Sequence, residues 1–263
     1  MSIALNRTSR LKAIACCTLL LGLFPFSVFA GDLDSANILF SKGNYEEAIP
    51  IYSRILNTVI DEDGTIMYRM GVCCLLSGRL SEARKYLDLA KQRNPNVFSG
   101  RISRVPSGSM EPTLLLGDYI IVKREFYAFS AIKRNDVVAL KIPGIEDKHL
   151  YVKRIIGLPG EKLEIRNNVV YIDDKKFDED RFGALGKSVS QKSVIAKDFG
   201  PKTIPEGSYF VLGDNRNTTF DSRHFGFVAR QAIAGKVLGV YQSIDSTQDP
   251  PIIRQDRTGL VIK

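Results

Sequence analysis

Two serines and one lysine in the second half of the chain are suited to nucleophilic catalysis: Ser107, Ser109 and Lys153. Both serines lie in a bend at 106–114, where Gly108 permits close approach of the backbone. A serine hydroxyl is a poor nucleophile and needs a base within hydrogen-bond reach. Such a bend can present a hydroxyl while directing backbone N–H groups at a developing oxyanion.

The candidate base is a lysine. The chain has two histidines, His149 and His224, and neither lies in a motif resembling a Ser-His-Asp arrangement. A neutral lysine can act as the base if burial lowers its pKa towards the working pH. Alternation along a predicted strand at 150–156 places Lys153 on one face and directs Arg154 to the other.

Other lysines lack such a setting. Lys123, Lys141 and Lys236 carry no comparable motif, and we expect them to be solvated surface charges. The segment at 130–133 satisfies S-x-x-K, a penicillin-binding signature, but S-D-N and K-T-G do not follow in a suitable place. We therefore dismiss that signature.

Four segments carry the candidate residues in a fixed order, namely 106–114, 117–123, 153–161, and 213–216 together with 221–223. In that order they resemble the sequence boxes of bacterial type I signal peptidases, and the resemblance spans roughly 97–245. It implies a serine endopeptidase that removes N-terminal signal peptides from exported precursor proteins. The implied cut follows small side chains, often Ala, at one and three residues before the scissile bond.

The resemblance also implies roles for individual residues. Ser109 is the implied acylating nucleophile, Lys153 the general base and Ser107 an oxyanion donor. Thr219 matches the position whose hydroxyl positions the lysine. No metal and no organic cofactor is implied.

The last box has two features of its own. Asp221 and Arg223 are expected to form a structural pair that holds the loop near the lysine, and His224 is also expected to be structural. Asn217 stands where many family members have Asp, which removes one charge from this loop.

Three other functions compete with signal peptide removal. A self-cleaving repressor-type protease uses a similar Ser/Lys pair, but an export-type N-terminus and the lack of a helix-turn-helix argue against it. A specialised relative that matures pilin or conjugation proteins stays open. So does a catalytically idle binding protein, although the complete set of candidate residues disfavours it.

Residues 34–95 have helical character and an internal repeat. The segment 43–48 is echoed by 78–83, 35 residues later, and Pro95 closes the second unit. This spacing resembles tetratricopeptide repeats. Two units are fewer than the usual three, so we expect packing on a neighbouring domain or a partner chain. The repeats are either a docking surface for a protein or an antiparallel helical spacer.

From residue 97 onward, short apolar or alternating runs are broken by Gly, Pro, Asn and Asp. Strands are predicted at 119–123, 137–142, 150–156, 163–172, 209–212 and 237–244. The polar stretch 178–202 is expected to be a surface excursion. The predicted fold class is α+β: a mainly antiparallel β catalytic domain at 97–263, preceded by the repeats at 34–95 and an apolar leader at 1–30.

The leader at 1–30 combines three basic residues with an apolar run that ends in Val28-Phe29-Ala30. Taken alone, it favours a cleavable secretory signal over a membrane anchor. The family resemblance favours the anchor, with the catalytic domain on the outer side of a bacterial inner membrane. The alternative location is the periplasm after cleavage.

The net charge of +8 divides into +3 for 1–30, −1 for 31–96 and +6 for the remainder. A basic exported domain would be attracted to anionic lipid head groups. Nucleic acid is a poorer candidate, because no binding motif accompanies the charge. The four cysteines all precede residue 75, so the second half cannot be a cysteine protease and needs no disulfide framework.

Overall fold

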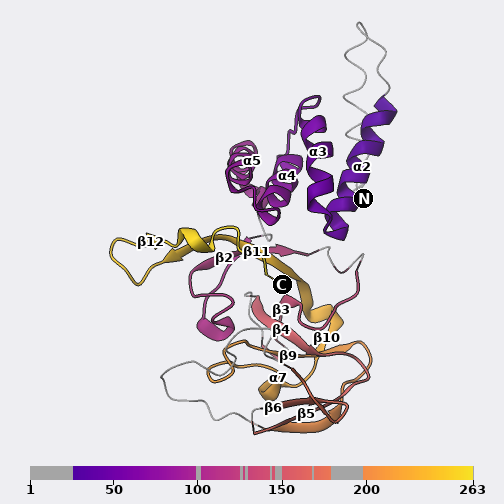
Figure 1. Ribbon diagram of the computed structural model, residues 1–263, viewed down its shortest axis with the longest axis vertical. Helices are drawn as coiled ribbons and strands as arrows, with labels where there is room; N and C mark the ends of the chain where they lie inside the picture. The colour runs from indigo at the N-terminus through magenta and orange to yellow at the C-terminus, as the bar shows by residue number, and fades with distance from the viewer. Residues whose placement is uncertain are drawn as a thin grey trace, which may run out of the picture.

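The computed structural model describes residues 26–98, 102–124, 127, 130–142, 144–145, 150–167, 169–178 and 198–262. Four antiparallel helices come first and an antiparallel β structure follows (Figure 1). The helices are α2 (Phe26–Lys42), α3 (Tyr45–Leu56), α4 (Thr65–Leu76) and α5 (Leu80–Arg93). A short 3-10 turn, η2 (Pro95–Phe98), leads into the strands.

Small residues let the helices pack closely. A Cβ atom on Gly71 of α4 would lie 2.6 Å from Cγ of Leu87 on α5, so only glycine fits there. Gly43 and Gly78 adopt positive φ at the tight turns that join α2 to α3 and α4 to α5. The repeated Gly at 43 and 78 thus marks the same turn in two helical pairs.

The expected leader at 1–30 lies largely outside the described residues. Its proposed end at residue 30 falls inside α2, which runs without a break from Phe26 to Lys42. Within the described ranges, each helix is too short or too polar to cross a lipid bilayer.

The described strands form two antiparallel sheets. The larger has the order β1-β2-β11-β3-β4-β9-β10, with β12 paired to β11, and the smaller has the order β7-β6-β5-β8. The strands of the larger sheet are β1 (Ile102–Arg104), β2 (Asp118–Lys123), β3 (Val137–Leu140), β4 (Tyr151–Gly157), β9 (Ser208–Leu212), β10 (Val228–Ala229), β11 (Ile233–Asp245) and β12 (Ile252–Ile253). Those of the smaller sheet are β5 (Lys162–Arg166), β6 (Val169–Ile172), β7 (Lys175–Lys176) and β8 (Phe199–Thr203).

Helices followed by an antiparallel β structure make an α+β fold, in agreement with the class predicted from sequence. One strand corrects the expected surface excursion at 178–202. Residues 199–203 form β8, which pairs with β5, while 179–197 lie outside the described residues.

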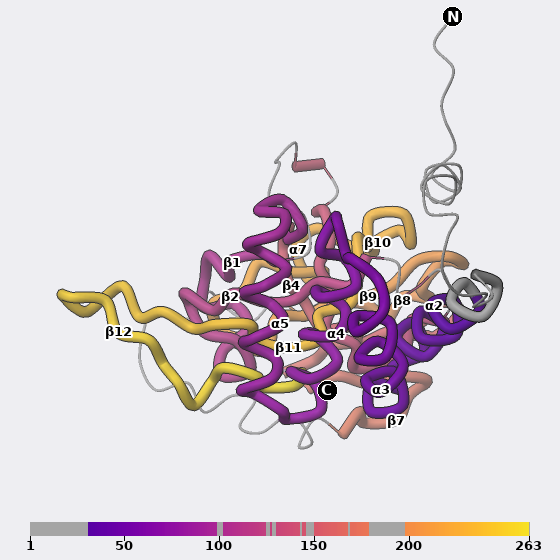
Figure 2. Tube along the Cα trace, turned by 90° about the horizontal axis from the view of Figure 1, so that it is seen from above, coloured from indigo at the N-terminus to yellow at the C-terminus, as the bar shows by residue number. Residues whose placement is uncertain are grey.

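The helical pairs pack directly on the larger sheet. Ile121 of β2 and Leu238 of β11 belong to the same apolar cluster as the buried helix side chains. The rings of Phe98 and Tyr241 lie 5.8 Å apart and extend this contact. Viewed from above, α4 and α5 lie over β11 (Figure 2). The neighbour that a two-unit repeat was expected to need is therefore the chain's own sheet.

Lys123 corrects a prediction at this junction. Expected to be a solvated charge, it is 6% exposed and lies between β2 and the helices. Its amine donates a hydrogen bond to the Phe40 carbonyl in the last turn of α2 and lies 4.3 Å from the Phe40 ring centroid. Both contacts favour a buried cation.

Alternation along β2 separates this junction from the candidate site. Ile121 and Lys123 face the helices, whereas Ile120 and Val122 face a second apolar cluster. Met110 and Leu114, from the segment after Ser109, belong to that second cluster. The candidate nucleophile and the helices therefore lie on opposite faces of β2.

Candidate active site

Ser109 lies in the middle of a 3-10 turn, η3 (Gly108–Met110), which contacts β4 in the interior of the larger sheet. The fully buried Met110 side chain anchors this turn. The backbone N–H of Asn215 donates to the Ser109 carbonyl at 3.1 Å, and the Asn215 side-chain amide donates to the Gly108 carbonyl at 3.1 Å. Two bonds from the loop after β9 thus hold the bend while leaving Ser109 half-buried.

Lys153 reaches this hydroxyl from the centre of β4. Its amine nitrogen lies 3.0 Å from Ser109 Oγ and donates a second hydrogen bond to the Val152 carbonyl at 3.1 Å. Only 2% of the residue is exposed. Ser109 and Lys153 are 44 residues apart in the sequence, and the structure brings these two predicted residues into contact.

Burial decides the charge state of this amine. Removal from water lowers the pKa of Lys153 to about 8, although the carboxylates of Asp221 and Asp214 act in the opposite direction. An amine with this pKa is neutral in about one molecule in ten at pH 7, against fewer than one in a thousand for an ordinary lysine. The neutral, proton-accepting form of this amine is therefore far more abundant than that of a water-exposed lysine.

Both nearby carboxylates are neutralised by arginines. Asp214 accepts two hydrogen bonds from the buried Arg154, at 2.8 and 2.7 Å. Asp221 accepts two from Arg223, each at 2.9 Å. Because each carboxylate has its own forked partner, neither forms an ion pair with Lys153. Arg154 leaves β4 on the side opposite Lys153, as alternation predicts.

Ser107 and Thr219 differ in their contacts with Ser109 and Lys153. Ser107 is exposed, and its hydroxyl lies 3.4 Å from Ser109 Oγ. Thr219 is buried next to Gly213, but among the described residues its hydroxyl has no hydrogen-bond partner. The bond from this hydroxyl to Lys153 that the resemblance implies is therefore not formed here.

His224 has a local role in the capping of α7 (Ser222–Phe225). Its ring nitrogen accepts from the Asp221 N–H at 3.4 Å, while the Asp221 side chain accepts from the Arg223 N–H at 3.2 Å. This reciprocal cap fixes the loop that carries Asp221.

The residue-by-residue expectations omitted Asn215, Asp214 and Thr113. Asp214 and Asn215 lie within the predicted segment 213–216, and Thr113 lies within 106–114, but no role was predicted for any of the three. Thr113 donates its hydroxyl to Asp214 at 2.6 Å, a contact across 101 residues that no local pattern could indicate.

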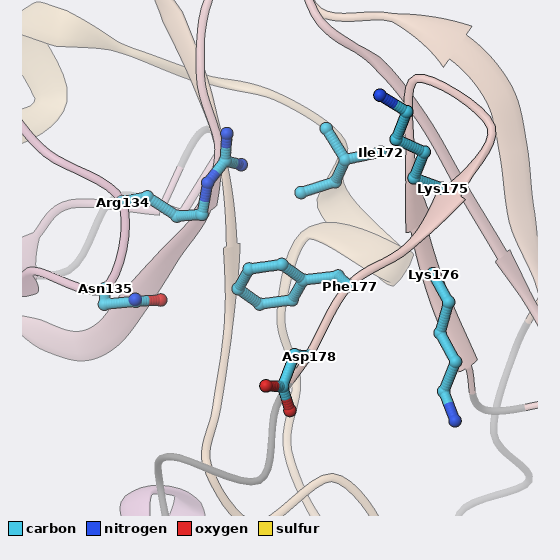
Figure 3. A pocket seen from close by; sticks show the side chains of 7 residues that line it. All are labelled: Arg134, Asn135, Ile172, Lys175, Lys176, Phe177 and Asp178. Atoms are coloured by element: carbon cyan, nitrogen blue, oxygen red, sulfur yellow. The ribbon is translucent and has the colours of Figure 1, made fainter.

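Other groupings do not suggest a second centre. Among the described residues, the His, Cys, Asp and Glu side chains do not gather in a cluster that could hold a metal ion. A hollow of about 300 Å³ lies away from Ser109 and Lys153, where Arg134 and Asn135 face Phe177 and Asp178 (Figure 3).

A buried lysine amine beside a serine hydroxyl, on an antiparallel β scaffold, has the chemistry of a serine hydrolase that works without histidine. Comparison with known families gives a closer assignment. The model of the signal peptidase family, peptidase S26, matches residues 96–242, so the chain belongs to this family. A tetratricopeptide repeat model matches residues 39–100.

Individual relatives agree with this assignment. The chain is 36% identical over 146 residues to the protein named Probable signal peptidase I-2 of Synechocystis sp., covering 53% of this chain and 62% of that relative. It is 38% identical over 146 residues to signal peptidase I of Bacillus caldolyticus, covering 54% and 78%. The match thus spans less than two thirds of the Synechocystis relative's length.

A solved structure adds a further likeness. The crystal structure of a signal peptidase I from Enterococcus faecalis V583 is 36% identical over 41% of this chain and 97% of its own, with a TM-score of 0.35.

Proposed function

We propose that this chain is a serine endopeptidase that removes signal peptides from exported precursor proteins, with Ser109 as nucleophile and Lys153 as general base. The observation that carries the proposal is the 3.0 Å contact between the Lys153 amine and Ser109 Oγ, made by an amine that is 2% exposed. Membership in the signal peptidase family supports the reaction class.

The reaction begins when neutral Lys153 takes the Ser109 proton as Oγ attacks the scissile carbonyl carbon. The resulting oxyanion is held by the Ser109 N–H and the Ser107 hydroxyl. Collapse of the intermediate breaks the C–N bond, and the Lys153 ammonium returns its proton to the leaving amine. Lys153 then deprotonates water, which attacks the ester carbon, and Ser109 recovers its proton as the acyl group leaves.

The positions of the residues around Ser109 and Lys153 support their proposed roles. Ser107 is exposed and its hydroxyl lies 3.4 Å from Ser109 Oγ, close enough to donate to the oxyanion that forms when Ser109 attacks. The Asp221–Arg223 ion pair holds the loop beside Lys153. Substrates are precursors with small side chains one and three residues before the cut. The division into a leader at 1–30, repeats at 34–95 and a catalytic part at 97–263 belongs to the same proposal.

Location follows from the substrate class. Precursors are cut where they emerge from the membrane, so residues 1–30 act as an anchor that keeps the catalytic part at the outer face of the inner membrane. The alternative is a periplasmic enzyme whose leader has been removed. Membrane fractionation together with N-terminal sequencing of the mature protein distinguishes them, because an intact Met1 end in the membrane fraction requires the anchor.

Cleavage of a purified precursor with an Ala-x-Ala site tests the activity. We expect Ser109→Ala and Lys153→Met to lower the rate by at least about a thousandfold. Ser130→Ala and Lys141→Met are matched controls away from the site and should retain the wild-type rate. Cleavage that survives either site variant would refute the dyad. A wild-type protein that cuts no precursor would favour a binding protein whose helical repeats recruit a partner.

A further inference from the structure

The C-terminal tail, residues 254–262, folds back over β11 towards the segment that follows Ser109. The Gly259 N–H donates to the Val240 carbonyl at 2.9 Å, and the Ile262 N–H donates to the Leu238 carbonyl at 3.0 Å. Ile262 is buried in the same apolar cluster as Met110. The family match ends at residue 242, so this tail lies beyond the matched residues.

Arg257, at the end of η6 (Gln255–Arg257), makes the tail's principal polar contact. Its guanidinium donates to both carboxylate oxygens of Asp118, the shortest contact being 2.6 Å, and to the Thr113 carbonyl at 2.9 Å. Asp118 is fully buried and also accepts the Leu115 N–H at 2.8 Å. Burial alone would raise the pKa of Asp118, but the bonds from Arg257 and Leu115 hold it below its usual value.

Thr113 connects this contact to the candidate site. Its carbonyl accepts from Arg257, while its hydroxyl donates to Asp214, the carboxylate paired with Arg154. Between Thr113 and Ser109 the chain makes one turn, closed by the Leu114 N–H on the Met110 carbonyl at 2.9 Å. A displacement of Thr113 would therefore also displace Ser109. Lys153 lies on a separate strand, β4, so the position of Ser109 relative to the Lys153 amine would change.

We propose that Arg257 is a positioning residue for the peptidase site. By binding Thr113 and Asp118, it fixes the position of the Ser109 turn relative to the Lys153 amine. This inference rests on the proposed function. It differs from a purely structural role, because losing the contact should change the chemical step at temperatures where the protein stays folded.

The test compares wild type, Arg257→Gln and Arg257→Lys in the full chain. Arg93→Gln, at the exposed end of α5, is the matched control. For each variant we would measure kcat, KM and the pH dependence of kcat/KM on an Ala-x-Ala precursor. Amide hydrogen exchange over 105–118 would be measured by mass spectrometry in the absence of substrate.

For Arg257→Gln we expect kcat to fall about tenfold to a hundredfold with KM nearly unchanged, because a displaced nucleophile loses alignment rather than substrate affinity. The midpoint of the acid limb should rise, since a displaced turn admits water to Lys153. Exchange over 105–118 should become about tenfold faster. Arg257→Lys should recover only part of kcat, because one ammonium cannot replace a guanidinium fork.

Wild-type kcat and an unmoved pH midpoint in Arg257→Gln would overturn the inference, even if the melting temperature fell. If wild type itself cuts no precursor, the proposed function fails separately. Hydrogen exchange then decides the remaining question: faster exchange over 105–118 supports Arg257 as the residue that fixes the Ser109 turn, and unchanged exchange rejects it.

Discussion

Replacing Lys153 with methionine should make the protein more stable while abolishing its activity. Methionine has a similar length and can be buried without losing a hydration shell. The Lys153 pKa falls from the usual 10.5 to about 8, chiefly because of burial. Each pKa unit corresponds to about 1.4 kcal/mol, so the buried ammonium costs about 3 kcal/mol of unfolding free energy at neutral pH.

The sign of the pH dependence follows from proton binding. Between about pH 8 and 10.5 the unfolded chain binds more protons at this lysine than the folded chain does, so wild-type stability rises with pH in that range. Below pH 8 the cost is fully present, and above pH 10.5 it disappears. The stability difference between Lys153→Met and wild type should therefore shrink from about 3 kcal/mol at pH 7 to below about 0.5 kcal/mol near pH 10.5.

Urea unfolding followed by far-ultraviolet circular dichroism at these two pH values measures the difference. In thermal scans at pH 7, the gain corresponds to roughly 6 to 12 °C for a protein of this size. Lys141→Met, at an exposed lysine, is the control and should show little change at either pH. If Lys153→Met were less stable than wild type at pH 7, or if its advantage persisted at pH 10.5, the amine would not be desolvated and the proposed base would be lost.

Three further results are expected. Cleavage should rise about tenfold from pH 7 to pH 9 as Lys153 loses its proton; a rate that is flat over this range in steady-state assays would contradict a lysine base. Gly213→Ala would place a Cβ atom 2.5 Å from the Ser109 carbonyl oxygen, so kcat should drop about tenfold or more while far-ultraviolet circular dichroism stays unchanged. Lys123→Met should lower the unfolding free energy by about 1–2 kcal/mol through loss of the contacts with Phe40, with kcat within about twofold of wild type; a large fall in kcat would mean that this junction controls the site.

The strands around the site were predictable because their apolar runs are short and clearly bounded. The predicted strand at 150–156 corresponds to β4 at Tyr151–Gly157, and 209–212 corresponds to β9 at Ser208–Leu212. Alternation also assigned Lys153 and Arg154 to opposite faces. Strands of two or three residues, such as β10 and β12, carry too few side chains to show a period.

The features that could not be predicted from the sequence depend on contacts between distant segments. Lys123 looked like a surface charge because nothing in its strand indicates that α2 covers that face. The contact of Arg257 with Thr113 joins residues 144 positions apart, so local patterns could not reveal it. The Thr219 hydroxyl matched the family by position, yet its bonding depends on rotamer and backbone details that a motif does not specify.

Because the helices pack on β2 and β11, deletion of the repeats would damage the β structure that remains. Deletion of 34–95 would expose the side chains of Ile121, Leu238 and Tyr241 to water. It would also remove the Phe40 carbonyl that accepts the hydrogen bond from the Lys123 ammonium. A truncated enzyme would then tend to self-associate, and lost cleavage could reflect precipitation rather than lost recruitment. Point changes on the outer faces of α3 and α5, which leave the sheet covered, are the sounder way to search for whatever the repeats bind.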